Sequence, residues 1–200
     1  MKLYLRVFAI SAMFVALACT ATDETPLGRY RSAVAAGQDA PLTAPATVLG
    51  IDLGMTDREY YDRCTELNRQ ELISVGRGGN ESQFVMQNDL DRPARMLFRP
   101  MFSGADPRIL DAVLAEFVYQ DWSPWNRDAN ASHLLPEVAD YLTRTLDTEL
   151  IEIDHPRRGK TFAGVEGGRL VAIWMADSSS VTATIANLGS LPADPLGLVK

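Results

Sequence analysis

One order of elements occurs twice along this chain, and it constrains the fold more than any other feature of the sequence. Residues 56–70 have the pattern of an amphipathic helix, and about four short β-rich segments follow as far as residue 120. Residues 132–148 repeat the helical pattern, and about four more strand-like segments follow. Helices that alternate with runs of neighbouring strands pack on an antiparallel sheet. We therefore predict an α+β fold of two helix-plus-sheet units in tandem, with about eight strands and with halves at about 48–120 and 131–188.

The helix boundaries have local signals. Thr56 and Glu59 form a Thr-x-x-Glu capping box at the start of the first helix. The second helix carries an apolar stripe at helical spacing, made of Leu134, Leu135, Val138, Leu142 and Leu146. Residues 48–53 are expected to form a short entry strand. Residues 109–120 fit either period, and the β-rich Phe117-Val118-Tyr119 end favours a strand.

The N-terminus has the three-part pattern of a secretory signal. Lys2 and Arg6 precede an apolar run over residues 7–18, and this run is too short to span a membrane as a helix. Ala16-Leu17-Ala18 then forms a small-x-small cleavage site. We expect residues 1–18 to be a signal peptide and the mature protein to be exported.

Cys19 follows this cleavage site directly. The stretch Ala-Leu-Ala-Cys resembles a bacterial lipobox, although the usual Leu three places before the Cys is here Ala16. The resemblance implies lipid attachment at Cys19 and anchoring to a membrane, and Thr20, which is not the Asp of inner-membrane retention, favours the outer membrane. The alternative is an ordinary signal-peptidase site that leaves a free thiol in a periplasmic or secreted protein.

Composition sets the remaining boundaries. Residues 20–47 are rich in Ala, Thr, Pro, Asp and Gly, so we expect residues 19–47 to be a lipid-anchored flexible tether. Residues 48–188 then form the folded domain, and residues 189–200 form a C-terminal tail.

The net charge is −7 and there is no extended Lys/Arg run, which argues against a nucleic-acid partner. With Cys19 committed to lipid, Cys64 has no cysteine with which to form an intrachain disulfide.

The candidate partner-binding residues lie in two places. Tyr119, Trp122 and Trp125 are concentrated in the connection between the halves, where they could form a binding surface or could equally fill the seam between the halves. Arg95 and Arg99 lie on one side of an expected strand and could meet an anionic partner, although a solvated face of charged side chains is the commoner explanation.

Catalytic and metal signals are weak. Cys64 could be a nucleophile with His133 or His155 as its base, but Cys64 lies on the apolar stripe of its helix, which favours a core role. The two histidines have no metal-ligand spacing, and Asp89 and Asp91 lack the continuation of a calcium loop. We predict no catalytic residue, no metal site and no cofactor.

Residues 49–67 carry a family resemblance. Leu-Gly-Ile-Asp-Leu-Gly-Met-Thr followed by a capped helix resembles the opening of small bacterial envelope lipoproteins of the SmpA/OmlA type. The stretch is also similar to the opening of each half of the β-lactamase-inhibitor-protein-like fold. The chain departs from the SmpA/OmlA pattern because it has two units and lacks a Leu-Gly-x-Pro stretch. The resemblance implies a fold and an envelope location, with no activity.

These observations together favour an envelope lipoprotein that acts as a non-enzymatic protein-binding or scaffolding module. Its partners would be the membrane, through the lipid anchor, and an envelope protein that binds its sheet face. The alternative is a periplasm-facing enzyme or enzyme accessory, for which the sequence assigns no substrate.

Overall fold

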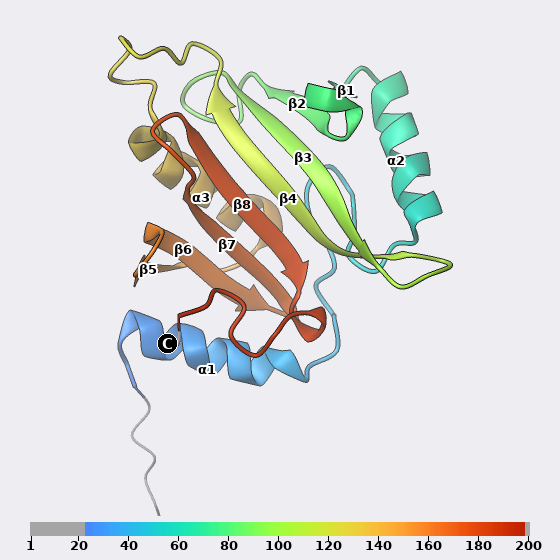
Figure 1. The fold of residues 1–200 in the computed structure, drawn as a ribbon, viewed down its shortest axis with the longest axis vertical. Helices are drawn as coiled ribbons and strands as arrows, with labels where there is room; N and C mark the ends of the chain where they lie inside the picture. Colours follow the sequence, from blue (N-terminus) through green and yellow to red (C-terminus); the bar gives the residue numbers. More distant parts are fainter. Residues whose placement is uncertain (1–22, 199–200) are drawn as a thin grey trace, which may run out of the picture.

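The computed structural model describes residues 23–198, which contain three α-helices and one eight-stranded antiparallel sheet (Figure 1). The helices are α1 (Pro26–Gln38), α2 (Asp57–Arg69) and α3 (Ala131–Leu146). The strands are β1 (Ile73–Val75), β2 (Ser82–Met86), β3 (Ala94–Ser103), β4 (Ile109–Tyr119), β5 (Ile151–His155), β6 (Gly159–Glu166), β7 (Arg169–Met175) and β8 (Ser180–Asn187). The predicted α+β class and strand number are confirmed, and so is the choice of a strand for residues 109–119.

The strands lie in the order β1-β2-β3-β4-β8-β7-β6-β5. Each run of four strands is a meander, and the two runs join where β4 pairs with β8. Consecutive antiparallel strands need only short turns, and several of these turns use residues with positive φ, such as Gly167 and Gly168 between β6 and β7. The sheet is therefore continuous from one half of the chain to the other.

Helices α2 and α3 contribute to the core on one face of the sheet, and Figure 1 shows α3 behind the strands and α2 beside β1. The stripe of α3 predicted from the sequence is buried there against residues such as Phe117, Ile173 and Val181. The capping box of α2 is also present, since the Thr56 N–H donates to Glu59 Oε2 at 2.8 Å and the Glu59 N–H donates to Thr56 Oγ1 at 3.3 Å. The apolar residues of α2 and α3, together with those of the strands they cover, form the larger of the two apolar cores.

The opposite face is covered over one half only. Helix α1 packs there on β5 and β6, with Tyr30 and Val34 buried beside Leu170. Residues that follow β8 complete this smaller core, and Leu196 is buried within it. Residues 189–200 were predicted to be a C-terminal tail, and the described part of this segment packs on the fold through Leu196.

The prediction of a flexible tether is wrong for its described residues. Thr25 caps α1, its side chain accepting from the Gly28 N–H, and Tyr30 is only 2% exposed. Beyond α1, the N–H groups of Thr43 and Ala44 both donate to the Gly167 carbonyl, at 2.8 and 3.2 Å. Few apolar residues suffice to dock α1, because Tyr30 and Val34 share a helix face and the sheet supplies the other side of the contact. The expected signal peptide and Cys19 lie outside the described residues.

The expected entry strand over residues 48–53 is also wrong. Leu49 and Gly50 have φ of 60° and 68°, and the Ile51 N–H donates to the Val48 carbonyl at 3.1 Å, so the chain turns here. A single bridge between Ala46 and Asp52 remains of the predicted strand. Val48 and Ile51, the apolar residues that suggested a strand, are fully buried in the core. A turn can bury such residues as well as a strand can.

Candidate functional site

The half of the sheet away from α1 has an uncovered face, which we call the open face. In Figure 1 no helix lies in front of β3, β4 and β8. Antiparallel register assigns the residues to this face, because directly opposed residues project to the same side. The open face is formed by Arg95, Leu97, Arg99, Met101, Leu114, Glu116, Val118, Thr182 and Thr184.

Two cations of the open face form no ion pair within residues 23–198. Arg95 and Arg99 take part in none of the ion pairs among residues 23–198, whereas the neighbouring Arg92 lies 3.3 Å from Asp121 and 3.9 Å from Asp128. The Arg95 Nε is buried and has no hydrogen-bond partner among the described residues. Glu116 stands opposite Leu97, between the two arginines, and its carboxylate is not within ion-pair distance of either. The open face therefore has an excess of positive charge on a chain of net charge −7.

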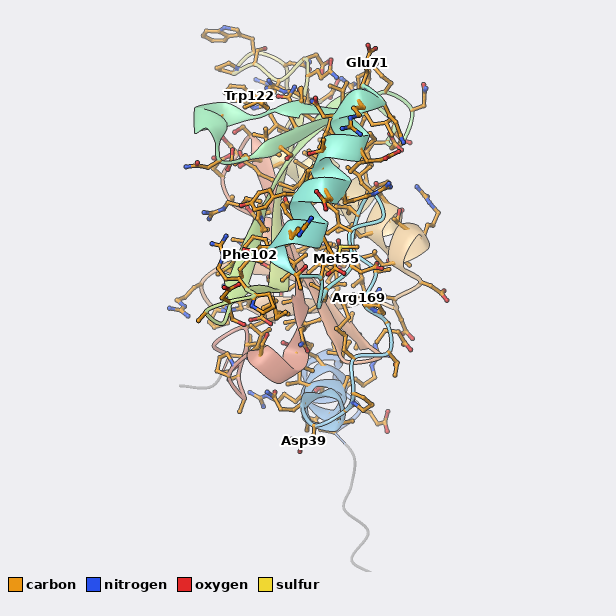
Figure 2. All side chains as sticks on the ribbon, turned by 90° about the vertical axis from the view of Figure 1, so that its right-hand side faces the viewer. Asp39, Met55, Glu71, Phe102, Trp122 and Arg169 are labelled. Atoms are coloured by element: carbon orange, nitrogen blue, oxygen red, sulfur yellow. The ribbon has the colours of Figure 1, made fainter. Side chains whose placement is uncertain are left out.

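A groove of about 590 Å³ lies beside the open face, between α2 and strands β1 to β3. The residues that give it its character are Tyr60, Tyr61, Cys64, Val75, Arg99 and Phe102. Tyr60 packs edge-on against both Tyr61 and Phe102, with ring centroids 5.4 and 5.5 Å apart. Figure 2 shows Phe102 beside the lower part of α2. The volume is in the range of small-ligand sites, and the lining is mixed apolar and polar.

Cys64 lies half-buried in this groove, and neither candidate base lies beside it to activate its thiol. Burial is the main cause that raises the pKa of the Cys64 thiol, and the opposing hydrogen bonds to Tyr60 and Ser82 are weaker causes. Neither His133 nor His155 lines the groove. Both ring nitrogens of His155 are engaged elsewhere, since Nε2 lies 2.8 Å from the Leu196 carbonyl and Nδ1 accepts from the N–H groups of Arg157 and Arg158. The structure does not bring a Cys–His pair together.

The predicted aromatic cluster is split. Tyr119 is 1% exposed on the helix-covered face, and its hydroxyl donates to Glu137 Oε1 at 2.6 Å, so its selection as a partner-binding residue is wrong. Trp122 is 38% exposed and Trp125 is 90% exposed, and neither fills a seam between the halves. Figure 2 shows Trp122 at the same end of the molecule as Glu71. The alternation of β4 explains the split, because Tyr119 is its last core-facing residue and the loop begins immediately after it.

The sequence interpretation missed the aromatic lining of the groove. Tyr60 and Tyr61 are adjacent on the helix predicted over residues 56–70, and adjacent helical residues point roughly 100° apart, so both cannot face the core equally. Tyr60 is 2% exposed and Tyr61 is 53% exposed. Two adjacent tyrosines on one helix were therefore the sequence feature that could have predicted an aromatic side chain outside the core.

Other site classes find no support in the part of the chain that the structure describes. Within residues 23–198, no group of three or more His, Cys, Asp or Glu side chains could hold a metal ion. None of the helices in this range is both long enough and apolar enough to cross a bilayer. No protein-family model matches the chain, and neither does any curated protein or solved structure.

Proposed function

We propose that this chain is a non-enzymatic binding module that holds an exported polypeptide partner on its open face. The uncovered half of the sheet is the single observation that carries the proposal. The same side of the sheet is sealed by α1 and the C-terminal residues over β5 to β7, yet β3, β4 and β8 have no such cover. Apolar side chains remain accessible there, with Met101 50% exposed and Leu114 half-buried. Leu97 and Val118 of the same face are buried. The accessible surface therefore combines the apolar side chains of Met101 and Leu114 with charged and polar ones, a mixture that protein interaction sites also show.

The membrane part of the proposal comes from the N-terminus. We propose that cleavage after Ala18 leaves Cys19 as a lipid-bearing first residue, most consistent with the outer membrane. The module would then be held close to the bilayer by residues 19–25, ahead of α1. We also propose that the two helix-plus-four-strand halves are copies of one unit, which would fit the β-lactamase-inhibitor-protein-like fold, since each half of that fold opens with a stretch similar to residues 49–67.

Site-specific photo-crosslinking in intact cells tests the proposal. A photoreactive amino acid would replace Thr184, on the open face, in one variant and Met101 in another. Matched control positions are Arg58 on α2 and Arg31 on α1, which are exposed on other surfaces. We expect a discrete crosslinked polypeptide from the two open-face positions and none from the controls. Crosslinking of equal yield at all four positions, or at none, would contradict a partner surface on the open face.

A further inference from the structure

Strand β3 extends beyond its neighbour β2. The pairing of β2 with β3 ends at Ser82 and Phe98, whereas β3 continues to pair with β4 as far as Ser103 and Ile109. Residues 99–103 therefore have a strand on one side only. A strand edge of this kind offers unpaired backbone groups to another extended chain.

The backbone groups on this free edge can be identified. The Gln120 N–H donates to the Pro93 carbonyl at 2.9 Å, so the odd-numbered residues of β3 direct their backbone groups toward β4 and the even-numbered ones direct theirs away. The bonds of Leu110, which lies opposite Phe102, agree with this assignment. The Leu110 N–H donates to the Met55 carbonyl and the Leu110 carbonyl accepts from the Gly54 N–H, both at 2.8 Å, so the backbone groups of Leu110 point away from β3. The edge thus offers the Pro100 carbonyl and both backbone groups of Phe102. Proline is tolerated at position 100 because its missing N–H would face outward.

The groove lies where an added strand would run. A chain that continued the line of β2 along residues 99–103 would lie between β3 and α2, next to Tyr60, Tyr61 and Phe102. Side chains of an added strand alternate between the two faces of the sheet. The one opposite Pro100 would enter the groove, and those opposite Arg99 and Met101 would lie at the edge of the open face.

The charge of Arg99 indicates which side chains the added strand should place at the edge of the open face. Arg99 lines both the groove and the open face and forms no ion pair within residues 23–198, although Glu81 also lines the groove. Opposite charges directly across an antiparallel pair stabilise it, and like charges destabilise it. We propose that the partner contributes an extended segment of alternating acidic and apolar residues, which adds to β3 at residues 99–103 and places an apolar side chain in the groove. This inference rests on the proposed function and names the chemistry of the partner.

Two labelled peptides and the purified full chain test the inference. One peptide is acetyl-Glu-Phe-Glu-Val-Glu-amide and the other has Lys in place of each Glu. We expect the acidic peptide to bind at least about tenfold more tightly by fluorescence anisotropy. We also expect it to slow hydrogen exchange of the Phe102 amide. Arg99→Glu should reverse the preference, whereas Arg58→Glu, on a side chain 90% exposed on α2, should leave it unchanged.

A second pair of variants tests the groove. Tyr61→Ala should weaken binding of the acidic peptide several-fold. Leu72→Ala is the matched control, because Leu72 is 44% exposed and does not line the groove. Equal affinity for the two peptides, no binding at roughly 1 mM, or binding without protection of Phe102 would each overturn the inference. So would a dimer of the chain that buries this edge. Crosslinking from Thr184 reports on the proposed function separately, since it requires a partner but no added strand.

Discussion

Arg169 has an unusual position for an arginine, because it is 2% exposed in the middle of the fold. Its guanidinium donates to the carbonyl of Ala46 at 2.8 Å, to that of Leu146, and to Thr148 Oγ1 at 2.6 Å. These acceptors belong to the segment before α2 and to the end of α3, so one side chain joins three parts of the chain. Burial lowers the pKa of Arg169, yet an arginine stays charged at neutral pH.

We predict that Arg169→Ala lowers the free energy of unfolding by about 3 kcal/mol or more, since the buried acceptors lose their donor and a cavity remains. Arg169→Lys should recover only part of this loss, because an ammonium lacks the planar fork that reaches separate acceptors. Urea unfolding of the purified variants measures the change. Arg31→Ala, at an exposed arginine, is the control. A loss for Arg169→Ala no greater than for that control would show that these bonds contribute little.

Cys64 gives a prediction about alkaline pH. Because burial raises its folded pKa, the thiol adds stability that is fully present below the unfolded pKa, near 8.5, and is lost as the pH rises through the folded pKa. Cys64→Ala should lower the free energy of unfolding at pH 7.5 by about 1 kcal/mol. Between pH 7.5 and pH 9.5 the wild type should lose more stability than this variant. Identical pH dependence of the two proteins would contradict the assignment.

At the scale of elements, α1 shows how a short helix with few apolar residues is held. Tyr30 is 2% exposed, and its hydroxyl has no hydrogen-bond partner among the described residues. Tyr30 therefore contributes through the packing of its ring. Burial also raises the pKa of Tyr30, so the hydroxyl stays protonated well above neutral pH.

We predict that Tyr30→Ala lowers stability by roughly 3 kcal/mol and exposes the Arg31 bond to trypsin, because the ring fills the contact between α1 and the sheet. Tyr30→Phe is the matched variant, and it should stay within about 0.5 kcal/mol of the wild type, since no hydrogen bond is lost. Limited proteolysis and urea unfolding provide the two measurements. Rapid cleavage after Arg31 in the wild type would instead favour the tether that the sequence predicted.

At the scale of the whole molecule, the proposed lipid anchor at Cys19 would decide where the open face works. We predict that the chain incorporates a fatty-acid analogue in bacterial cells, and that Cys19→Ala abolishes the label, because the thiol is the acceptor of the lipid. Cys64→Ala should label normally and serves as the control. Persistent labelling of Cys19→Ala would rule out this residue as the attachment site.

Sequence patterns determined those features that depend on neighbouring residues. The Thr56–Glu59 capping box, the buried stripe of α3 and the β-rich end of β4 were all predictable, because each is set by contacts or spacings within a few residues. The class of the fold follows from the order of such elements. The same local reasoning failed at residues 26–38, whose apolar residues were too few to predict a packed helix.

Tertiary structure alone decided where the surfaces are. Helix α1 packs because β5 to β7, more than a hundred residues later in the chain, supply its apolar partner. The free edge of β3 exists because β2 is shorter, and the groove exists because α2 lies across that gap. Neither the length difference between paired strands nor the uncovered half of a sheet has a local pattern in the sequence. Both depend on which distant segments meet, and that is fixed by the burial of the whole chain.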